Sequence, residues 1–326
     1  MSKRVASLSC DLDNKWSYMK THGDDGWESF PSYLDIAVPR ILEFCEQRNL
    51  DITVFVVGQD AALEKNHRVL RSIADAGHEI GNHSFNHEPW LHLYSENQLE
   101  EEFDLAEEHI FNATGKKTVG FRGPGFSLSQ KTLRVLSNRG YEYEASTFPT
   151  FLGPLARAYY FMTADLTKTE REEREQLFGK FREGFRPLKP YAWEMEGRET
   201  NPLIEIPVTT MPVFKLPIHI SYILYLGQFS PFLARFYFRM AMVLCRAFDV
   251  APSLLLHPLD FMGCNDDSDL SFFPVMGLPA ERKIRLVGEA VDMMTQSFNV
   301  GTMLEHAREI RATSAQPMPL VPYVVY

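Results

Sequence analysis

The segment Asp51-Ile52-Thr53-Val54-Phe55-Val56-Val57-Gly58 decides the fold class of this chain. It is almost continuously apolar, rich in β-branched residues and closed by a glycine, which is the pattern of a strand covered on both faces. Residues 34–49 before it have apolar side chains at helical spacing, and residues 5–10 form a further short apolar run. Together these segments predict a strand–helix–strand unit in a parallel α/β sheet.

The alternation of helix and strand continues regularly to residue 146. We expect helices over 63–76, 95–114 and 132–139, and strands over 79–82, 119–122 and 141–146. Ser95 and Gln98 have the spacing of a capping box, and Gly77 is suited to end the helix before it. This regularity favours a barrel-like or doubly wound sheet over separate domains.

Two regions depart from this alternation. Residues 14–33 lack periodicity and predict a loop, and residues 147–202 are irregular, aromatic and basic, with a charged helix expected near 168–181. We therefore expect one domain over 1–326 with a largely helical, aromatic-rich insertion at about 147–250. Tyr159, Tyr160 and Phe161 within it fit either a core cluster or a sugar-stacking platform. Strands over 203–208 and 253–256 and a helix over 279–297 resume the pattern.

Composition narrows the class of partner. The chain has 326 residues, 45% of them apolar, and a net charge of −10 without a basic tract, which argues against nucleic acid. Cys10, Cys45, Cys245 and Cys264 are far apart and lack CxxC spacing, so we expect reduced thiols in a cytoplasmic protein. The start of the chain runs directly into the first strand, and we expect no signal peptide.

Residues 231–248 predict an amphipathic helix with Arg235, Arg239 and Arg246 near one face. One interpretation is a helix packed on the barrel with a solvated face. The other is contact with the inner membrane surface or a lipid-linked substrate. Partial exposure of the apolar segment 216–248 would favour membrane contact or a homo-oligomer, although the segment is too interrupted to cross a bilayer.

Polar residues that could carry chemistry follow four of the predicted strands: Asp11 and Asp13, His83 and His87, Arg122, and His257. In parallel α/β folds this end of the sheet hosts the active site. His83 and His87 are four residues apart, so on a helical turn they would share one face and could close on a single metal ion. Asp11 and Asp13 would project together from a strand, which is costly unless a cation or an arginine offsets their charge.

These residues and their order resemble the polysaccharide deacetylase family (NodB homology, carbohydrate esterase family 4). The motifs are Asp11-Leu12-Asp13, His83-Ser84-Phe85-Asn86-His87, Arg122-Gly123-Pro124-Gly125 and Leu254-Leu255-Leu256-His257-Pro258. The acidic motif is D-x-D rather than an adjacent pair. This spelling resembles the branch that contains peptidoglycan deacetylases, allantoinase-like amidohydrolases and lipid-linked aminoarabinose deformylases. The resemblance implies a distorted (β/α) barrel.

The resemblance also implies a metal site and its cofactor. Asp13, His83 and His87 would bind a divalent ion, leaving positions open for water and a substrate carbonyl. We expect zinc, although two histidines and one aspartate suit cobalt, iron or nickel as well.

The remaining roles follow from the same resemblance. Asp11 would be the general base, Arg122 would pair with it, and His257 would be the general acid. The metal and a backbone N–H near Gly123 to Phe126 would stabilise the oxyanion, and Pro124 and Gly125 of this segment would lie beside the substrate. Each residue also has a structural interpretation: a turn cap for Asp11, a loop ion pair for Arg122 and a hydrogen-bonded core histidine for His257.

Five further residues accompany the predicted site. Glu205 and Asp260 are candidates for holding His257, and Trp16 and Trp90 for substrate walls, while His78 fits a structural role.

The sequence therefore predicts a metal-dependent hydrolase of non-peptide C–N bonds that removes an acetyl or formyl group from a carbohydrate or lipid-linked amino sugar. Two alternatives remain: an allantoinase-like amidohydrolase acting on a small cyclic amide, and a non-catalytic metabolite-binding barrel.

Overall fold

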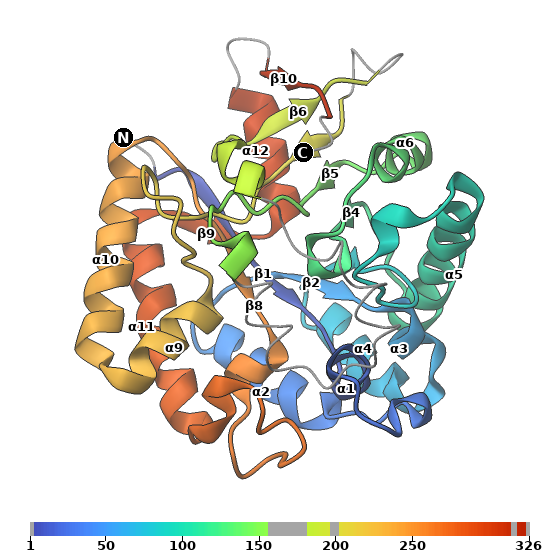
Figure 1. Ribbon diagram of the computed structural model, residues 1–326, viewed down its shortest axis with the longest axis horizontal. Helices are drawn as coiled ribbons and strands as arrows, with labels where there is room; N and C mark the ends of the chain where they lie inside the picture. Colours follow the sequence, from blue (N-terminus) through green and yellow to red (C-terminus); the bar gives the residue numbers. More distant parts are fainter. Residues whose placement is uncertain (1–2, 156–180, 196–201, 314–317, 324–326) are drawn as a thin grey trace.

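A single curled sheet forms the centre of the molecule (Figure 1). The computed structural model describes residues 3–155, 181–195, 202–313 and 318–323. Its strands are β1 (Val5–Asp11), β2 (Thr53–Val56), β3 (Glu79–Asn82), β4 (Gly120–Phe121), β5 (Tyr143–Glu144), β6 (Tyr191–Trp193), β7 (Ile204–Glu205), β8 (Ser253–Leu256), β9 (Asn299–Gly301) and β10 (Leu320–Val321).

The sheet has the order β10-β6-β7-β5-β4-β3-β2-β1-β8, and β9 also pairs with β1. Every pairing is parallel except that of β6 with β7. The sheet curls into a half-barrel, so the predicted distorted (β/α) barrel is confirmed. Because β8, β1, β2, β3 and β4 are consecutive neighbours, their carboxyl ends meet along one edge.

Helices surround this sheet on its outer side (Figure 1). They are α1 (Lys15–His22), α2 (Leu34–Glu46), α3 (Gly58–Ala62), α4 (Glu64–Asp75), α5 (Glu96–Thr114), α6 (Gln130–Arg139), α9 (Ile220–Phe229), α10 (Pro231–Ala247), α11 (Ala280–Ser297) and α12 (Met303–Thr313). The capping box at Ser95 is present, with the Gln98 side chain returning to the Ser95 backbone. The largest core cluster packs apolar faces of α2, α4, α10 and α11 against β1, β2 and β8.

The prediction of a loop over residues 14–33 is wrong. Lys15–His22 is a helix whose first turn is capped by Asn14, which accepts a hydrogen bond from the Lys15 amide. Trp16 and Ser17 are its buried residues, and its apolar side chains do not repeat at helical spacing. Local capping therefore decides the conformation here, and the hydrophobic pattern does not reveal it.

In the region 147–250, the described residues form β6, β7, the short 3-10 helix Phe181–Phe185, α9 and α10. The residues Tyr159, Tyr160 and Phe161 and nearly all of the helix expected near 168–181 lie outside the described residues. Within the described ranges, every helix is too short or too polar to cross a bilayer. All four cysteines, which the structure describes, are free thiols.

Candidate metal centre and active site

Adjacent strands deliver the predicted site residues to one edge of the sheet. Asp11 is the last residue of β1, and His83 and Arg122 directly follow β3 and β4. Leu256 of β8 pairs with Cys10 of β1, which places the next residue, His257, beside the end of β1. Strand order thus brings together side chains that are up to 246 positions apart in the sequence.

Asp13, His83 and His87 converge on one point. The Asp13 carboxylate Oδ1 lies 3.3 Å from Nε2 of His83 and 3.0 Å from Nε2 of His87. One ligand atom from each residue lies within 4.8 Å of the other two, and all three side chains are buried. This donor set has the size and composition of a divalent metal site with positions left open.

Second contacts orient the imidazoles for this role. His83 Nδ1 lies 2.6 Å from the carbonyl oxygen of Arg122, which fixes its Nε2 toward Asp13. Burial opposes ionisation of Asp13, but the two histidines outweigh it and hold the pKa of Asp13 well below its usual range. A buried carboxylate that stays ionised between two imidazoles fits a bound cation.

The two histidines do not lie on a helix, so that part of the prediction is wrong. They belong to a loop in which Ser84 and His87 have positive φ angles of 62° and 53°. Glu102 of α5 shapes this loop, because its Oε1 accepts hydrogen bonds from the amides of Phe85 and Asn86 at 2.9 and 2.7 Å. The histidines meet because the loop turns back on itself.

Asp11 and Arg122 form a buried ion pair beside the metal site. Arg122 Nη1 donates to Asp11 Oδ1 at 2.7 Å and to the Ser9 hydroxyl at 2.8 Å, and its Nε donates to the Ala145 carbonyl at 3.0 Å. The other carboxylate oxygen of Asp11 lies 4.0 Å from Nε2 of His83. Asp11 therefore presents one oxygen to the arginine and the other toward the metal site.

His257 is held by Asp260 and by Ser221, a residue that the sequence did not suggest. The Ser221 hydroxyl lies 3.3 Å from His257 Nδ1 and donates to Asp260 Oδ1 at 3.0 Å. Asp260 Oδ2 accepts the His257 backbone amide at 2.8 Å. His219 also lies near, with its ring centre 6.2 Å from that of His257. Burial, and then His257, lower the pKa of His219 to about 3, so it stays neutral.

The prediction that Glu205 could hold His257 is wrong. Glu205 is buried in another cluster, where it accepts hydrogen bonds from the Thr147 amide and hydroxyl and from Trp193 Nε1. Its register partner on β5 is Glu144. Burial, and then this second carboxylate, raise the pKa of Glu205 well above its usual value. A strand residue at the end of β7 lies several strands from β8, which the sequence pattern could not show.

Trp16 is not a substrate wall either. Its side chain is buried, and Nε1 donates to Asp60 Oδ1 at 3.0 Å, while its ring lies edge-on to His87. Asp60 also accepts a bond from Asn14 at 2.6 Å. Trp16 therefore packs against the candidate metal ligand His87 and does not line a substrate site. Trp90 is half-buried, and its role as a substrate wall stays a prediction.

The loop after Arg122 is tightly constrained. A Cβ on Gly123 would lie 2.0 Å from the Ser127 carbonyl oxygen, and Gly125 has a φ angle of 57°. The Gly123 amide donates to the Ser146 hydroxyl and the Phe126 amide to the Gly123 carbonyl. Both of these amides therefore already have acceptors. Of the amides predicted near Gly123 to Phe126 as oxyanion donors, Gly125 remains the candidate, because Pro124 has no N–H.

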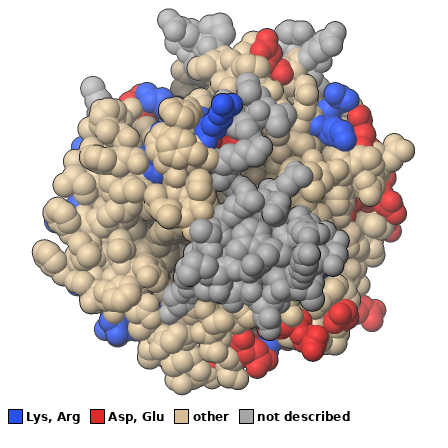
Figure 2. Space-filling view, viewed as in Figure 1, with Lys and Arg blue, Asp and Glu red and all other residues tan. Residues whose placement is uncertain are grey.

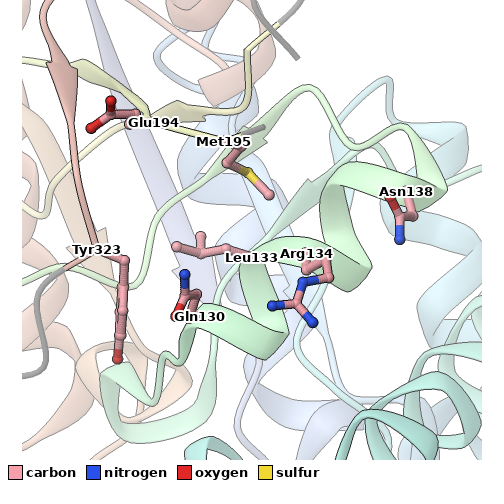
Figure 3. A pocket seen from close by; sticks show the side chains of 7 residues that line it. All are labelled: Gln130, Leu133, Arg134, Asn138, Glu194, Met195 and Tyr323. Atoms are coloured by element: carbon pink, nitrogen blue, oxygen red, sulfur yellow. The ribbon is translucent and has the colours of Figure 1, made fainter. Parts of the chain in front are cut away.

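A separate pocket lies away from these residues. It has a volume of about 380 Å³ and is bounded by α6, the segment after β6 and the chain after β10 (Figure 3). Its lining residues are Gln130, Leu133, Arg134, Asn138, Glu194, Met195 and Tyr323. No predicted site residue contributes to it, so this pocket carries no part of the proposed chemistry.

The half-barrel thus holds a His–His–Asp cluster that could bind a metal ion, with a buried Asp–Arg pair beside it. Residues 23–144 match the family model described as polysaccharide deacetylase, which confirms the resemblance predicted from the motifs. This match includes His83, His87 and Arg122.

Curated relatives point to the same family. The chain is 28% identical to a peptidoglycan deacetylase of Helicobacter pylori, over 51% of this chain and 56% of the relative. It is 30% identical to the peptidoglycan-N-acetylmuramic acid deacetylase PdaA of Bacillus subtilis, over 32% of this chain and 39% of the relative. The chain thus spans about half the length of the curated relatives it matches.

Solved structures support the fold over nearly the whole chain. A Mycobacterium smegmatis protein assigned to the polysaccharide deacetylases superposes with a TM-score of 0.64 and 20% identity, covering 99% of this chain and 96% of its own. PuuE allantoinase superposes with a TM-score of 0.57 and 18% identity, covering 96% and 92%. At these identities the likeness concerns the fold.

Proposed function

We propose that this protein is a metal-dependent hydrolase that removes an N-acyl group, acetyl or formyl, from an amino sugar. The observation that carries the proposal is the convergence of Asp13, His83 and His87 beside the Asp11–Arg122 pair. The names of the curated relatives support an amino sugar as the substrate class. A divalent ion held by these three residues would polarise the acyl carbonyl and supply an acidic water.

The carboxylate of Asp11 is the group placed to take a proton from the attacking water. Its hydrogen bond with Arg122 engages one carboxylate oxygen and leaves the other directed toward the site. A buried arginine cannot give up its own proton, so it stabilises the base without competing for the role.

His257 is the group proposed to protonate the leaving nitrogen. Hydrolysis breaks the C–N bond, adds the water oxygen to the acyl carbon and requires one proton on the departing amine. Ser221 and Asp260 hold His257 from the side of Nδ1 and the backbone. The proton taken by Asp11 and the proton given by His257 balance, so the products are a carboxylic acid and an amine.

A release assay tests the proposal. Metal-loaded protein is incubated with N-acetyl and N-formyl amino sugars, with a lipid-linked amino sugar, and with allantoin, and acetate, formate or ureide product is measured. We expect release of acid from at least one amino sugar, and a loss of about 10²–10⁴-fold in Asp11→Asn. Arg68→Gln, an exposed change on α4, serves as the control and should keep full activity.

Two outcomes would replace the proposal. Turnover of allantoin alone would favour the allantoinase-like alternative. Absence of turnover on every substrate, in wild type as in Asp11→Asn, would leave only a binding role for the fold.

A further inference from the structure

Helices α9 and α10 expose a row of large apolar side chains. The row consists of Tyr225, Phe229, Phe232, Phe236, Met240 and Val243, which follow one another at intervals of three or four residues. Phe229 and Phe232 are 71% and 76% exposed. In α10 this spacing puts the members on one side of the helix, opposite the buried residues Ala234, Phe238 and Cys245.

The solvated helix considered above does not explain this row. A solvated helix face carries polar side chains, whereas here large apolar side chains are exposed from Phe232 near the start of α10 to Val243 near its end. Figure 2 shows that the surface over α10, on the left, is largely free of charged residues.

The charged side chains within residues 216–248 are all positive. Residues 216–248 contain Arg235, Arg239 and Arg246 and no Asp, Glu or Lys, although the whole chain has a net charge of −10. All three arginines are exposed. Arg235 pairs with Glu289 of α11 at 2.7 Å, while Arg239 and Arg246 continue the basic series along α10. Aromatic and aliphatic side chains flanked by arginines are the composition of helices that lie in a membrane interface.

The same helix pair reaches the candidate active site. Ser221, in the first turn of α9, contacts His257, and Tyr225 and Phe229 of the row lie farther along this helix. A helix of this length spans about 15 Å. A membrane or protein surface that binds the apolar row would therefore lie within about 15 Å, the length of α9, of His257.

We propose that the apolar row and its arginines dock the protein on an anionic lipid surface, with the apolar side chains inserted between headgroups and the arginines pairing with lipid phosphates. Positive charges beside the row favour an anionic bilayer over a second copy of this acidic chain, which would present the same arginines to each other. The proposal does not depend on the reaction that the active site performs.

Vesicle flotation tests this proposal with the full chain. We expect wild-type protein to float with phosphatidylcholine vesicles that contain 30% phosphatidylglycerol, and to bind pure phosphatidylcholine at least about tenfold more weakly. Phe232→Ser/Phe236→Ser and Arg239→Glu/Arg246→Glu should each reduce binding to the anionic vesicles by about tenfold or more. Circular dichroism verifies that each variant is folded.

Matched controls change the same chemistry elsewhere on the surface. Phe111→Ser/Leu320→Ser removes two side chains of similar exposure, and Lys116→Glu/Lys117→Glu reverses two exposed charges. Both should float like wild type. Wild type that stays unbound to anionic vesicles, or controls that lose binding as fully as the row variants, would overturn the proposal. So would a concentration-dependent dimer that Phe232→Ser/Phe236→Ser dissociates, if the wild type does not float.

Discussion

Arg122 donates a hydrogen bond from Nη1 to Oδ1 of Asp11 at 2.7 Å, and both side chains are buried. The same guanidinium bonds to Ser9 on β1 and to the Ala145 carbonyl after β5. The Arg122 side chain thus links the chain after β4 to strand β1 and to the chain after β5, and it orients the proposed base.

Replacing Arg122 by methionine should cost about 3–5 kcal/mol of unfolding free energy, because Asp11 would remain buried without its partner. Activity should fall with it, since Asp11 would lose the hydrogen bond that orients its carboxylate. Arg122→Lys keeps the charge and should recover part of the stability. Urea unfolding of the two variants gives the comparison, and equal stability of Arg122→Met and wild type would contradict the pair's importance.

His87→Ala should abolish stoichiometric metal binding, because a site of three protein ligands loses one of them and His83 and Asp13 alone hold a divalent ion weakly. Metal content after gel filtration measures this. His67→Ala, on α4 and away from the site, is the matched control and should bind as wild type. Full metal content in His87→Ala would refute the assigned ligand set.

Ser221→Ala should lower kcat by about tenfold and change KM little, because it removes the hydroxyl that links His257 to Asp260. Ser221→Thr retains a hydroxyl and should restore most of the rate. Steady-state kinetics on the preferred amino sugar separates the two parameters. A rise in KM at constant kcat would instead assign Ser221 to substrate binding.

Asp60→Asn should flatten the pH dependence of stability. Burial raises the pKa of Asp60 to about 7, despite hydrogen bonds from Asn14 and Trp16 that work in the opposite direction. Between the unfolded value near 4 and this folded value, the native state binds more protons, so its stability falls as pH rises through that window. Asparagine does not titrate and should remove a contribution of roughly a few kcal/mol.

Thermal unfolding of both proteins at pH 4 to 8 measures the Asp60 effect. The stability difference between wild type and Asp60→Asn should change across this range in favour of the variant as pH rises. A constant difference would show that Asp60 does not take up a proton on folding.

The sequence was sufficient to predict those features that depend on a single strand or helix. Residues 79–82 form β3 as predicted, and the strand that ends before His257 appears as β8. The motif residues Asp11, Asp13, His83, His87 and Arg122 meet because parallel neighbouring strands bring their carboxyl ends together, a rule that needs no side-chain detail.

It was insufficient where contacts are long-range. Asp60, Glu102 and Ser221 support the site from α3, α5 and α9, and no spacing in the sequence ties them to the motifs. The prediction for Glu205 was wrong for a related reason. Glu205 ends a strand, as the true site residues do, but the strand order places it beside Glu144 and away from His257. The prediction that His83 and His87 lie on a helical turn was wrong because the loop between them is held by hydrogen bonds from the Phe85 and Asn86 amides to Glu102.

The carbonyl of Arg122 orients His83, whereas its side chain holds Asp11. The backbone atom survives any replacement of the side chain, and the guanidinium does not. Position 122 therefore contributes to the site twice, and mutation can separate the two contributions: a chain altered there would keep the carbonyl that orients His83 and lose the guanidinium that holds Asp11.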